Sequence, residues 1–164
     1  MRLARGFEGP LAVVSARGRH LAEPIEGPLD ILVPMTGADA SRRGAEVAFV
    51  LAHATQAPIT ILHVADPAAT EAFRRGRLQQ RNEGVALRGE VEKLAARFRV
   101  TVKTIVRVNI APEDAILRQA RLGNHNLIVM GVSRRPGDSL SFGNVAAAIL
   151  ESAERSLLFV STGV

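Results

Sequence analysis

The sequence of 164 residues contains no cysteine, no tryptophan and no tyrosine. The absence of cysteine excludes disulfide bonds, thiolate catalysis and cysteine-ligated zinc, and it fits a reducing compartment. Aromatic residues make up only 4% of the chain, so there is little material for a surface on which nucleic-acid bases could stack. The core must instead be built from alanine, valine, leucine and isoleucine, which suits helices packed closely on a sheet.

Long hydrophobic segments are also missing. The longest apolar runs, such as Val145 to Leu150, are far shorter than the roughly 20 residues that span a bilayer. The first 18 residues contain arginines but no apolar segment of about 7 to 15 residues, so a secretory signal is not expected. We therefore expect a soluble, cytoplasmic chain with no direct membrane insertion.

The residues that are present indicate one globular domain with a basic surface. Hydrophobic residues make up 47% of the chain, which is enough for a sizeable core. The formal charge of +5 and the pI of about 11.1 raise nucleic acid, anionic lipid and phosphate ligands as partners. The arginine pairs, however, lie in segments that also carry acids, as on an ordinary solvated surface. We expect no nucleic-acid partner.

Short apolar runs alternate with helical periodicity from residue 29 onward. The apolar runs predict buried strands at 29–34, 59–64, 100–108, 127–130 and 156–160. Between them, helical spacing predicts helices at 41–55, 85–98, 111–123 and 144–153. Ser41 and Asn144 are the expected N-caps, and Pro112 suits the first position of its helix. The polar segment 65–84 should be a mobile or partly helical excursion.

This order of elements predicts an α/β fold. Continuous apolar strands separated by helices indicate a three-layer α/β/α sandwich around a five-stranded parallel sheet, joined by right-handed crossovers. In such Rossmann-like folds, ligands bind at the carboxyl ends of the strands, where the strand order reverses. The loops after Pro34, Val64 and Met130 are therefore the first places to look for a site.

Residues 1–27 fall outside this count and are assigned as a linker or the tail of a preceding domain, with the main domain at 28–164. The segment GPLAVVSARG nevertheless resembles the chain's own ending, RSLLFVSTG. It is either the last strand of a preceding copy or a linker that contains a docked strand.

The loop from Met130 to Val145, MGVSRRPGDSLSFGNV, is the most informative stretch for function. Its glycines permit positive φ and close approach to a ligand, and free N–H groups at the helix start near Asn144 favour a phosphate. Arg134 and Arg135 could add charged donors. Plain turn chemistry explains the same glycines, and the loop has no GK[ST] sequence of the Walker A type.

Five segments together resemble the universal stress protein family over Leu29 to Thr162. They are ILVPMTG, ILHV, LIVMG, the loop into GNVA, and SLLFVST. The resemblance implies the UspA-like, adenine nucleotide alpha hydrolase-like fold and a site for ATP or another adenine nucleotide. It places that site at Thr36, Gly37, Val64, Met130, Gly131, Ser133, Arg134, Gly143, Asn144 and Val145.

Some of these positions depart from the pattern of the ATP-binding branch. Gly131 and Gly143 match its first and third glycines, but Arg134 stands in place of the second and the spacing from there is one residue short. Thr36 stands where that branch has an aspartate, and Asn144 replaces a hydroxyl residue. Both can still form hydrogen bonds, so an altered nucleotide preference and a loss of binding remain equally open.

The segments SRRGAEVA and GVSRRPGD are most similar to those of universal stress domains fused behind bacterial monovalent cation/proton antiporters. That likeness implies a regulatory nucleotide-sensing module, with an antiporter as a partner in cis that could tether it to the inner membrane. We expect a homodimer through the C-terminal edge strand at 156–160, and the alternative function is a scaffold of the same fold that dimerises through this strand and binds no nucleotide. No catalytic residues and no metal site are expected, because the four histidines are scattered and the loop serines lack a base.

Overall fold

The computed structural model describes residues 9–22, 28–36, 38–64, 77–133 and 142–161, with the side chains of 77–84 excepted. Six strands and five helices alternate along this part of the chain. Their order is β1 (Leu11–Ser15), α1 (Arg19–Ala22), β2 (Ile31–Met35), α2 (Asp39–Thr55), β3 (Ile59–Val64), α3 (Arg77–Phe98), β4 (Val102–Arg107), α4 (Pro112–Leu122), β5 (Leu127–Gly131), α5 (Asn144–Ser152) and β6 (Ser156–Ser161).

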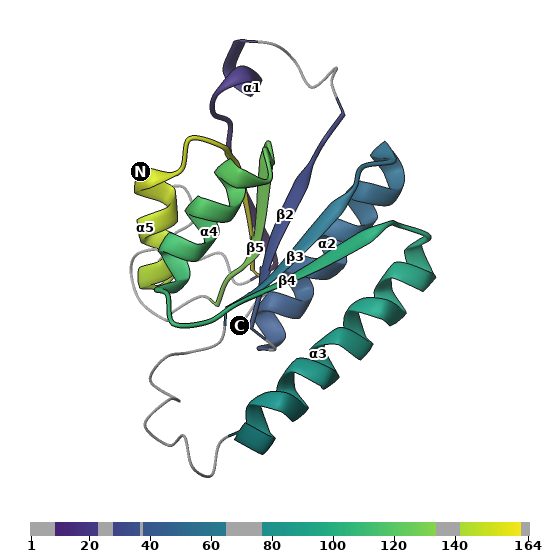
Figure 1. Cartoon of the computed structure of the whole chain (residues 1–164). Helices are drawn as coiled ribbons and strands as arrows, with labels where there is room; N and C mark the ends of the chain where they lie inside the picture. Colours follow the sequence, from purple (N-terminus) through teal and green to yellow (C-terminus); the bar gives the residue numbers. More distant parts are fainter. Residues whose placement is uncertain (1–8, 23–27, 37, 65–76, 134–141, 162–164) are drawn as a thin grey trace.

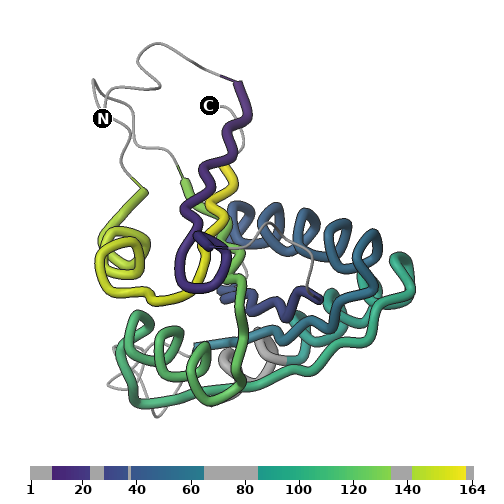
Figure 2. Tube along the Cα trace, turned by 90° about the horizontal axis from the view of Figure 1, so that it is seen from above, coloured from purple at the N-terminus to yellow at the C-terminus, as the bar shows by residue number. Residues whose placement is uncertain are grey.

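All strands belong to one sheet, in the order β1-β6-β5-β2-β3-β4. The five strands from β2 to β6 are parallel, as the alternation of apolar strands and helices predicts. The prediction of a purely parallel, five-stranded sheet was incomplete, because β1 joins β6 antiparallel as a sixth strand (Figure 2). Residues 11–15 therefore form part of this sheet as a docked strand, and the expectation that 156–160 is an edge strand was wrong, because β1 covers β6.

The helices cover both faces of the sheet, with α2 and α3 on one side and α4 and α5 on the other (Figure 1). Successive side chains of β2 point to opposite faces of the sheet and so pack in different layers. Ile31, Val33 and Met35 pack in the α2/α3 layer, whereas Leu32 packs in the α4/α5 layer. Because the central strands β2 and β5 are apolar and buried on both faces, burial stabilises both layers together and gives the predicted α/β/α sandwich.

Several element boundaries differ from the sequence prediction. The strand β2 runs through Pro34 to Met35 instead of ending at the proline, and α3 begins at Arg77 rather than at residue 85. Helix α2 begins at Asp39 after the N-cap residue Ala38, so Ser41 lies inside the first turn and is not the N-cap. Helix α4 begins at Pro112 as expected, and Gly123 is its C-cap.

Helix α3 is the longest described helix, with 22 residues, but its sequence is rich in charged and polar side chains. Across the described ranges, no helix combines the length and the apolar character that crossing a membrane requires.

Candidate functional site

The strand order reverses between β2 and β5, and the two strands separate there. From β2 the chain proceeds outward to β3 and β4, and then returns to β5 and β6 on the other side. The pairing of β2 with β5 comprises only Ile31 with Leu127 and Leu32 with Ile128. Beyond these pairs the carboxyl ends of the two strands are no longer joined, which is the crevice where α/β folds bind ligands.

Pro34 lies in the separated part of β2. Proline is normally excluded from interior strands because it lacks the N–H group that a ladder needs. Here the residue lies beyond the last β2–β5 pair, so its missing donor removes no ladder bond between these two strands. The proline is therefore compatible with the opening of the crevice.

A cavity of about 330 Å³ occupies this crevice, a volume within the range of small-molecule sites. Its wall is mostly apolar, with backbone and hydroxyl groups at intervals. The lining residues come from the ends of β2, β3 and β5 and from the starts of α2, α4 and α5: Pro34, Met35, Thr36, Ala38, Ala40, Ser41, Leu62, Val64, Pro112, Ile116, Met130, Gly131, Val132, Ser133, Phe142, Gly143, Val145 and Ala146.

Most of the site residues predicted from the sequence meet in this cavity. Those among its lining are Thr36, Val64, Met130, Gly131, Ser133, Gly143 and Val145. Asn144 opens α5 but is not among the lining residues, and the expectation that it caps the helix was wrong, because Gly143 is the N-cap. Gly37 and Arg134 lie outside the described residues.

Sequence reasoning missed the contributions of α2 and α4 to the wall. Ala38, Ala40 and Ser41 come from the start of α2, while Pro112 and Ile116 come from α4. A usable signal was present for α2, because a helix that follows the carboxyl end of a central strand begins near the crevice, whereas α4 follows the edge strand β4 and had no such signal. Phe142, which also lines the cavity, stacks on Phe159 with ring centroids 5.5 Å apart.

Gly131 allows α2 to approach β5 at backbone distance. A Cβ atom at position 131 would lie 1.6 Å from the carbonyl oxygen of Ala40, and a Cβ at Gly44 would lie 2.2 Å from the backbone nitrogen of Gly131. Only glycine at both positions permits this contact, which brings the start of α2 to the edge of the cavity. The packing role explains Gly131 without any ligand contact.

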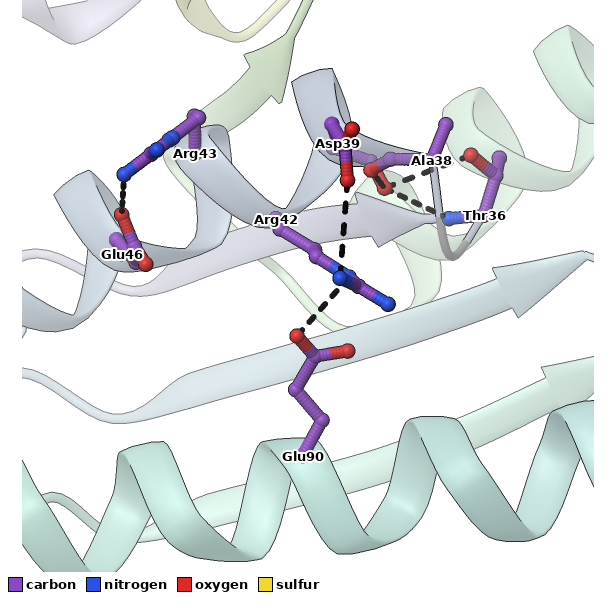
Figure 3. Close-up of polar contacts among 8 residues, drawn as sticks. Thr36, Ala38, Asp39, Arg42, Arg43, Glu46 and Glu90 are labelled. Atoms are coloured by element: carbon purple, nitrogen blue, oxygen red, sulfur yellow. Dashed lines mark hydrogen bonds and ion pairs between the residues drawn. The ribbon is translucent and has the colours of Figure 1, made fainter.

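The loop between β2 and α2 is organised by Ser41, which is buried. Its hydroxyl donates to the carbonyl oxygen of Ala38 at 2.9 Å and accepts from the backbone N–H of Thr36 at 3.3 Å (Figure 3). The Thr36 hydroxyl also lies 3.4 Å from the Ser41 hydroxyl. Thr36 is thus held at the mouth of the cavity while its side chain stays exposed.

A second hollow of about 720 Å³ lies between α2 and α3 and shares Thr36 with the first. Arg42 reaches across it from α2 and forms an ion pair of 3.0 Å with Glu90 on α3 (Figure 3). His63 faces the same hollow, and its Nδ1 lies 3.1 Å from the carbonyl oxygen of Met35. The hydrogen bond to a carbonyl gives His63 a structural role.

Within the ranges that the structure describes, no three His, Asp or Glu side chains gather closely enough to hold a metal ion. The cavity is instead defined by apolar side chains, hydroxyl groups and helix starts.

Comparison with known proteins agrees with this fold. Residues 29–161 match the model of the universal stress protein family. A universal stress protein from Archaeoglobus fulgidus is similar in structure, with a TM-score of 0.63 and 19% identity over 80% of this chain and 98% of that one. No curated protein matches the chain.

Two further structures of similar fold were solved with nucleotides. A universal stress protein in complex with cAMP has a TM-score of 0.63 and 20% identity, covering 84% of this chain and 100% of its own. A family protein from Arabidopsis thaliana with AMP bound has a TM-score of 0.61 and 19% identity, covering 84% of this chain and 94% of its own.

Proposed function

Because the chain belongs to the universal stress protein family, we propose that it is a regulatory domain that binds an adenine nucleotide in the cavity between β2 and β5. One observation carries the proposal: the starts of α2, α4 and α5 all converge on this cavity. Each of these helices follows a residue with no hydrogen-bonding side chain, namely Ala38, Ala111 or Gly143. Their first-turn N–H groups therefore lack a cap from that position and can bind an anion.

Among the three helices, α5 is the best placed to receive a phosphate. The first turn of α2 contains Asp39, and that of α4 contains Glu113 and Asp114, whereas the first turn of α5 contains no acid. Carboxylates there would compete with a phosphate for the positive end of the helix dipole. Gly143, at φ +85°, turns the chain into α5 in a conformation that other residues adopt only with strain.

Apolar side chains in the lining of the cavity suit the base. Leu62, Val64, Ile116 and Met130 are among the lining residues, and flat heteroaromatic rings are commonly held between such side chains. The two structures of similar fold with cAMP and AMP show that other proteins of this fold bind adenine nucleotides. A domain of this kind senses a nucleotide when binding favours one of two states of the protein.

The first test is the thermal unfolding of the whole chain with AMP, cAMP, ADP and ATP, and with adenosine and inorganic phosphate as partial ligands. A nucleotide at 100 times its dissociation constant should add about 2.7 kcal/mol. For a chain of this length that amounts to a rise of roughly 5 to 10 °C in Tm. No rise with any nucleotide would favour the alternative, a scaffold that binds none. Release of phosphate during the assay would contradict the proposal that the domain has no catalytic residues of its own.

Replacement of Asn144 by aspartate should change stability and binding in opposite directions. A carboxylate in the first turn of α5 should stabilise the free protein by about 0.3 to 1 kcal/mol through the helix dipole. The same charge should weaken nucleotide binding about tenfold, because two like charges several ångströms apart repel by roughly 1 to 2 kcal/mol near a protein surface. Urea unfolding and calorimetric titration measure the two effects separately.

Ser152→Asp is the matched control, because Ser152 is exposed and ends the same helix. A carboxylate at the negative end of α5 should lower stability and leave nucleotide affinity unchanged. Equal affinities of the Asn144→Asp variant and the unmodified chain would remove α5 from the phosphate site.

We also propose a narrower version, in which the domain regulates an attached cation/proton antiporter. Its support is the likeness of SRRGAEVA and GVSRRPGD to antiporter-fused domains, and it stays a prediction from the sequence. The measurement that tests it is ion flux through the transporter with and without the nucleotide. A flux that does not depend on the nucleotide would contradict it.

A further inference from the structure

The strand β6 would form the edge of the parallel sheet if β1 did not cover it. All five residues of β1 pair with β6, from Leu11 opposite Ser161 to Ser15 opposite Leu157, with Val13 opposite Phe159 at the centre. The two strands lie side by side along their length (Figure 2). An uncovered strand edge is a ready template for pairing with another chain, so this cover decides what β6 can bind.

Further contacts hold β1 in place after the strand ends. The Arg17 guanidinium donates to the carbonyl oxygens of Leu150 and Ala153 at the end of α5, where a cation also complements the helix dipole. The backbone N–H of Arg17 donates to the Ser156 hydroxyl at 3.0 Å, and Nδ1 of His20 lies 2.7 Å from the same hydroxyl. The segment that follows β1 is therefore anchored to both α5 and β6.

The sequence of β1 is similar to that of β6. When LAVVS is aligned with LLFVS, leucine, valine and serine coincide at the first, fourth and fifth positions. In this alignment Val13 corresponds to Phe159, and these two residues face one another at the centre of the pairing. The strand β1 thus presents to β6 much the same sequence, in the same antiparallel sense, that β6 of a second copy would present.

One face of β1 is exposed, whereas the corresponding face of β6 is covered by a helix. Leu158 and Val160 on β6 pack against the α2 layer, but their counterparts on β1 are Ala12 and Val14, which are exposed, Val14 to 70%. A second copy would bring its own α2 to cover the corresponding side chains. The second copy is therefore the partner that completes this surface.

We propose that β1 is a built-in cover for a self-association edge, and that its release lets the β6 strands of two copies pair antiparallel about Phe159. While β1 is docked, its tether gives it an effective concentration near the millimolar range. A second copy at micromolar concentration cannot displace it, so the chain stays monomeric at this edge. This proposal does not depend on nucleotide binding.

Val13→Asp tests the proposal in the full chain, with Val14→Asp as its matched control. Val13 packs in the α4/α5 layer, so a carboxylate there should release β1, whereas Val14 is exposed on the same strand and should tolerate it. Analytical ultracentrifugation should give a monomer for the unmodified chain and for Val14→Asp, and a doubled mass for Val13→Asp. Amide exchange of Leu157–Ser161 should stay slow in that dimer.

Other outcomes would overturn the proposal. A Val13→Asp monomer with rapidly exchanging β6 amides would show that the uncovered edge does not self-associate. A dimer of the unmodified chain that dissociates on Val13→Asp would show that β1 is exchanged between copies instead of covering its own β6. If Val13→Asp does not fold, Arg17→Ala gives the milder release, and it should produce a concentration-dependent dimer that the unmodified chain lacks.

A disulfide lock checks that β6 is the interface. The chain has no cysteine, so Ala12→Cys with Val160→Cys, at paired positions of β1 and β6, introduces the sole thiol pair. Combined with Arg17→Ala, the oxidised protein should be monomeric and the reduced protein dimeric. A dimer that persists after oxidation would place the interface elsewhere and overturn the proposal.

Discussion

Replacement of Gly131 by alanine is expected to lower the free energy of unfolding by about 3 kcal/mol, the upper part of the range for overpacked cores. The new Cβ would lie 1.6 Å from the carbonyl oxygen of Ala40 and 2.4 Å from its carbonyl carbon. Both are backbone atoms of α2, so no side-chain rotation can relieve the clash. The start of α2 would have to move away from β5, and the wall of the cavity would move with it.

Gly89→Ala is the matched control for this prediction. A Cβ at position 89, in α3, meets no atom within 4 Å, and alanine there should stabilise the helix by about 0.5 to 1 kcal/mol. Urea unfolding of the two variants should therefore give changes of opposite sign. If Gly131→Ala unfolds within about 0.5 kcal/mol of the unmodified protein, where ordinary surface substitutions fall, the close packing of α2 on β5 would be contradicted.

The layered fold was predictable because its signals are local. The strand at Ile59–Val64 was predicted with its observed bounds, since a short run rich in isoleucine, leucine and valine that begins after a proline is typical of a buried strand. The order of strands and helices then indicated the switch point, and with it the carboxyl ends of the central strands. The loops after Val64 and Met130 could be placed at the cavity from the sequence for this reason, whereas Gly131 was assigned to the site by the family resemblance.

Features that depend on tertiary contact could not be predicted in the same way. The start of α2 is not set by the capping preference of Ser41, because the helix begins before that residue and its hydroxyl serves the preceding loop instead. Gly44 carries no local signal, since its requirement comes from the backbone of β5. The likeness of β1 to β6 was visible in the sequence, but the pairing of the two strands required the structure.

The amino-terminal ends of β2 and β5 are held together by a polar network opposite the cavity. The carbonyl oxygen of Asp30 accepts from the backbone N–H of Asn126, and the Asn126 side chain accepts from the N–H of Asp30 at 2.8 Å. The Asp30 carboxylate lies 2.5 Å from Nδ1 of His125, which is only 3% exposed. Because so few ladder pairs join these strands, the network fixes the junction from which they separate to form the cavity.

Asp30→Ala is accordingly expected to lower the free energy of unfolding by about 2 to 3 kcal/mol, since a hydrogen bond to a charged group is lost and a buried partner remains. Nε2 of His125 is buried and has no hydrogen-bond partner among the described residues, so the substitution would leave both ring nitrogens without one. Urea unfolding measures the loss. The same variant should also weaken nucleotide binding, because the separation of β2 from β5 defines the cavity.

Two companion variants identify the cause. Asp30→Asn keeps an acceptor oxygen within reach of His125 and should retain most of the stability, whereas a loss as large as that of alanine would assign the effect to charge. Asp39→Ala removes an exposed carboxylate from the first turn of α2, at the other end of the sheet, and should cost only about 0.3 to 1 kcal/mol through the helix dipole. If Asp30→Ala proves no more harmful than Asp39→Ala, the junction of β2 and β5 is held by apolar packing alone, and the polar network would not fix the shape of the cavity.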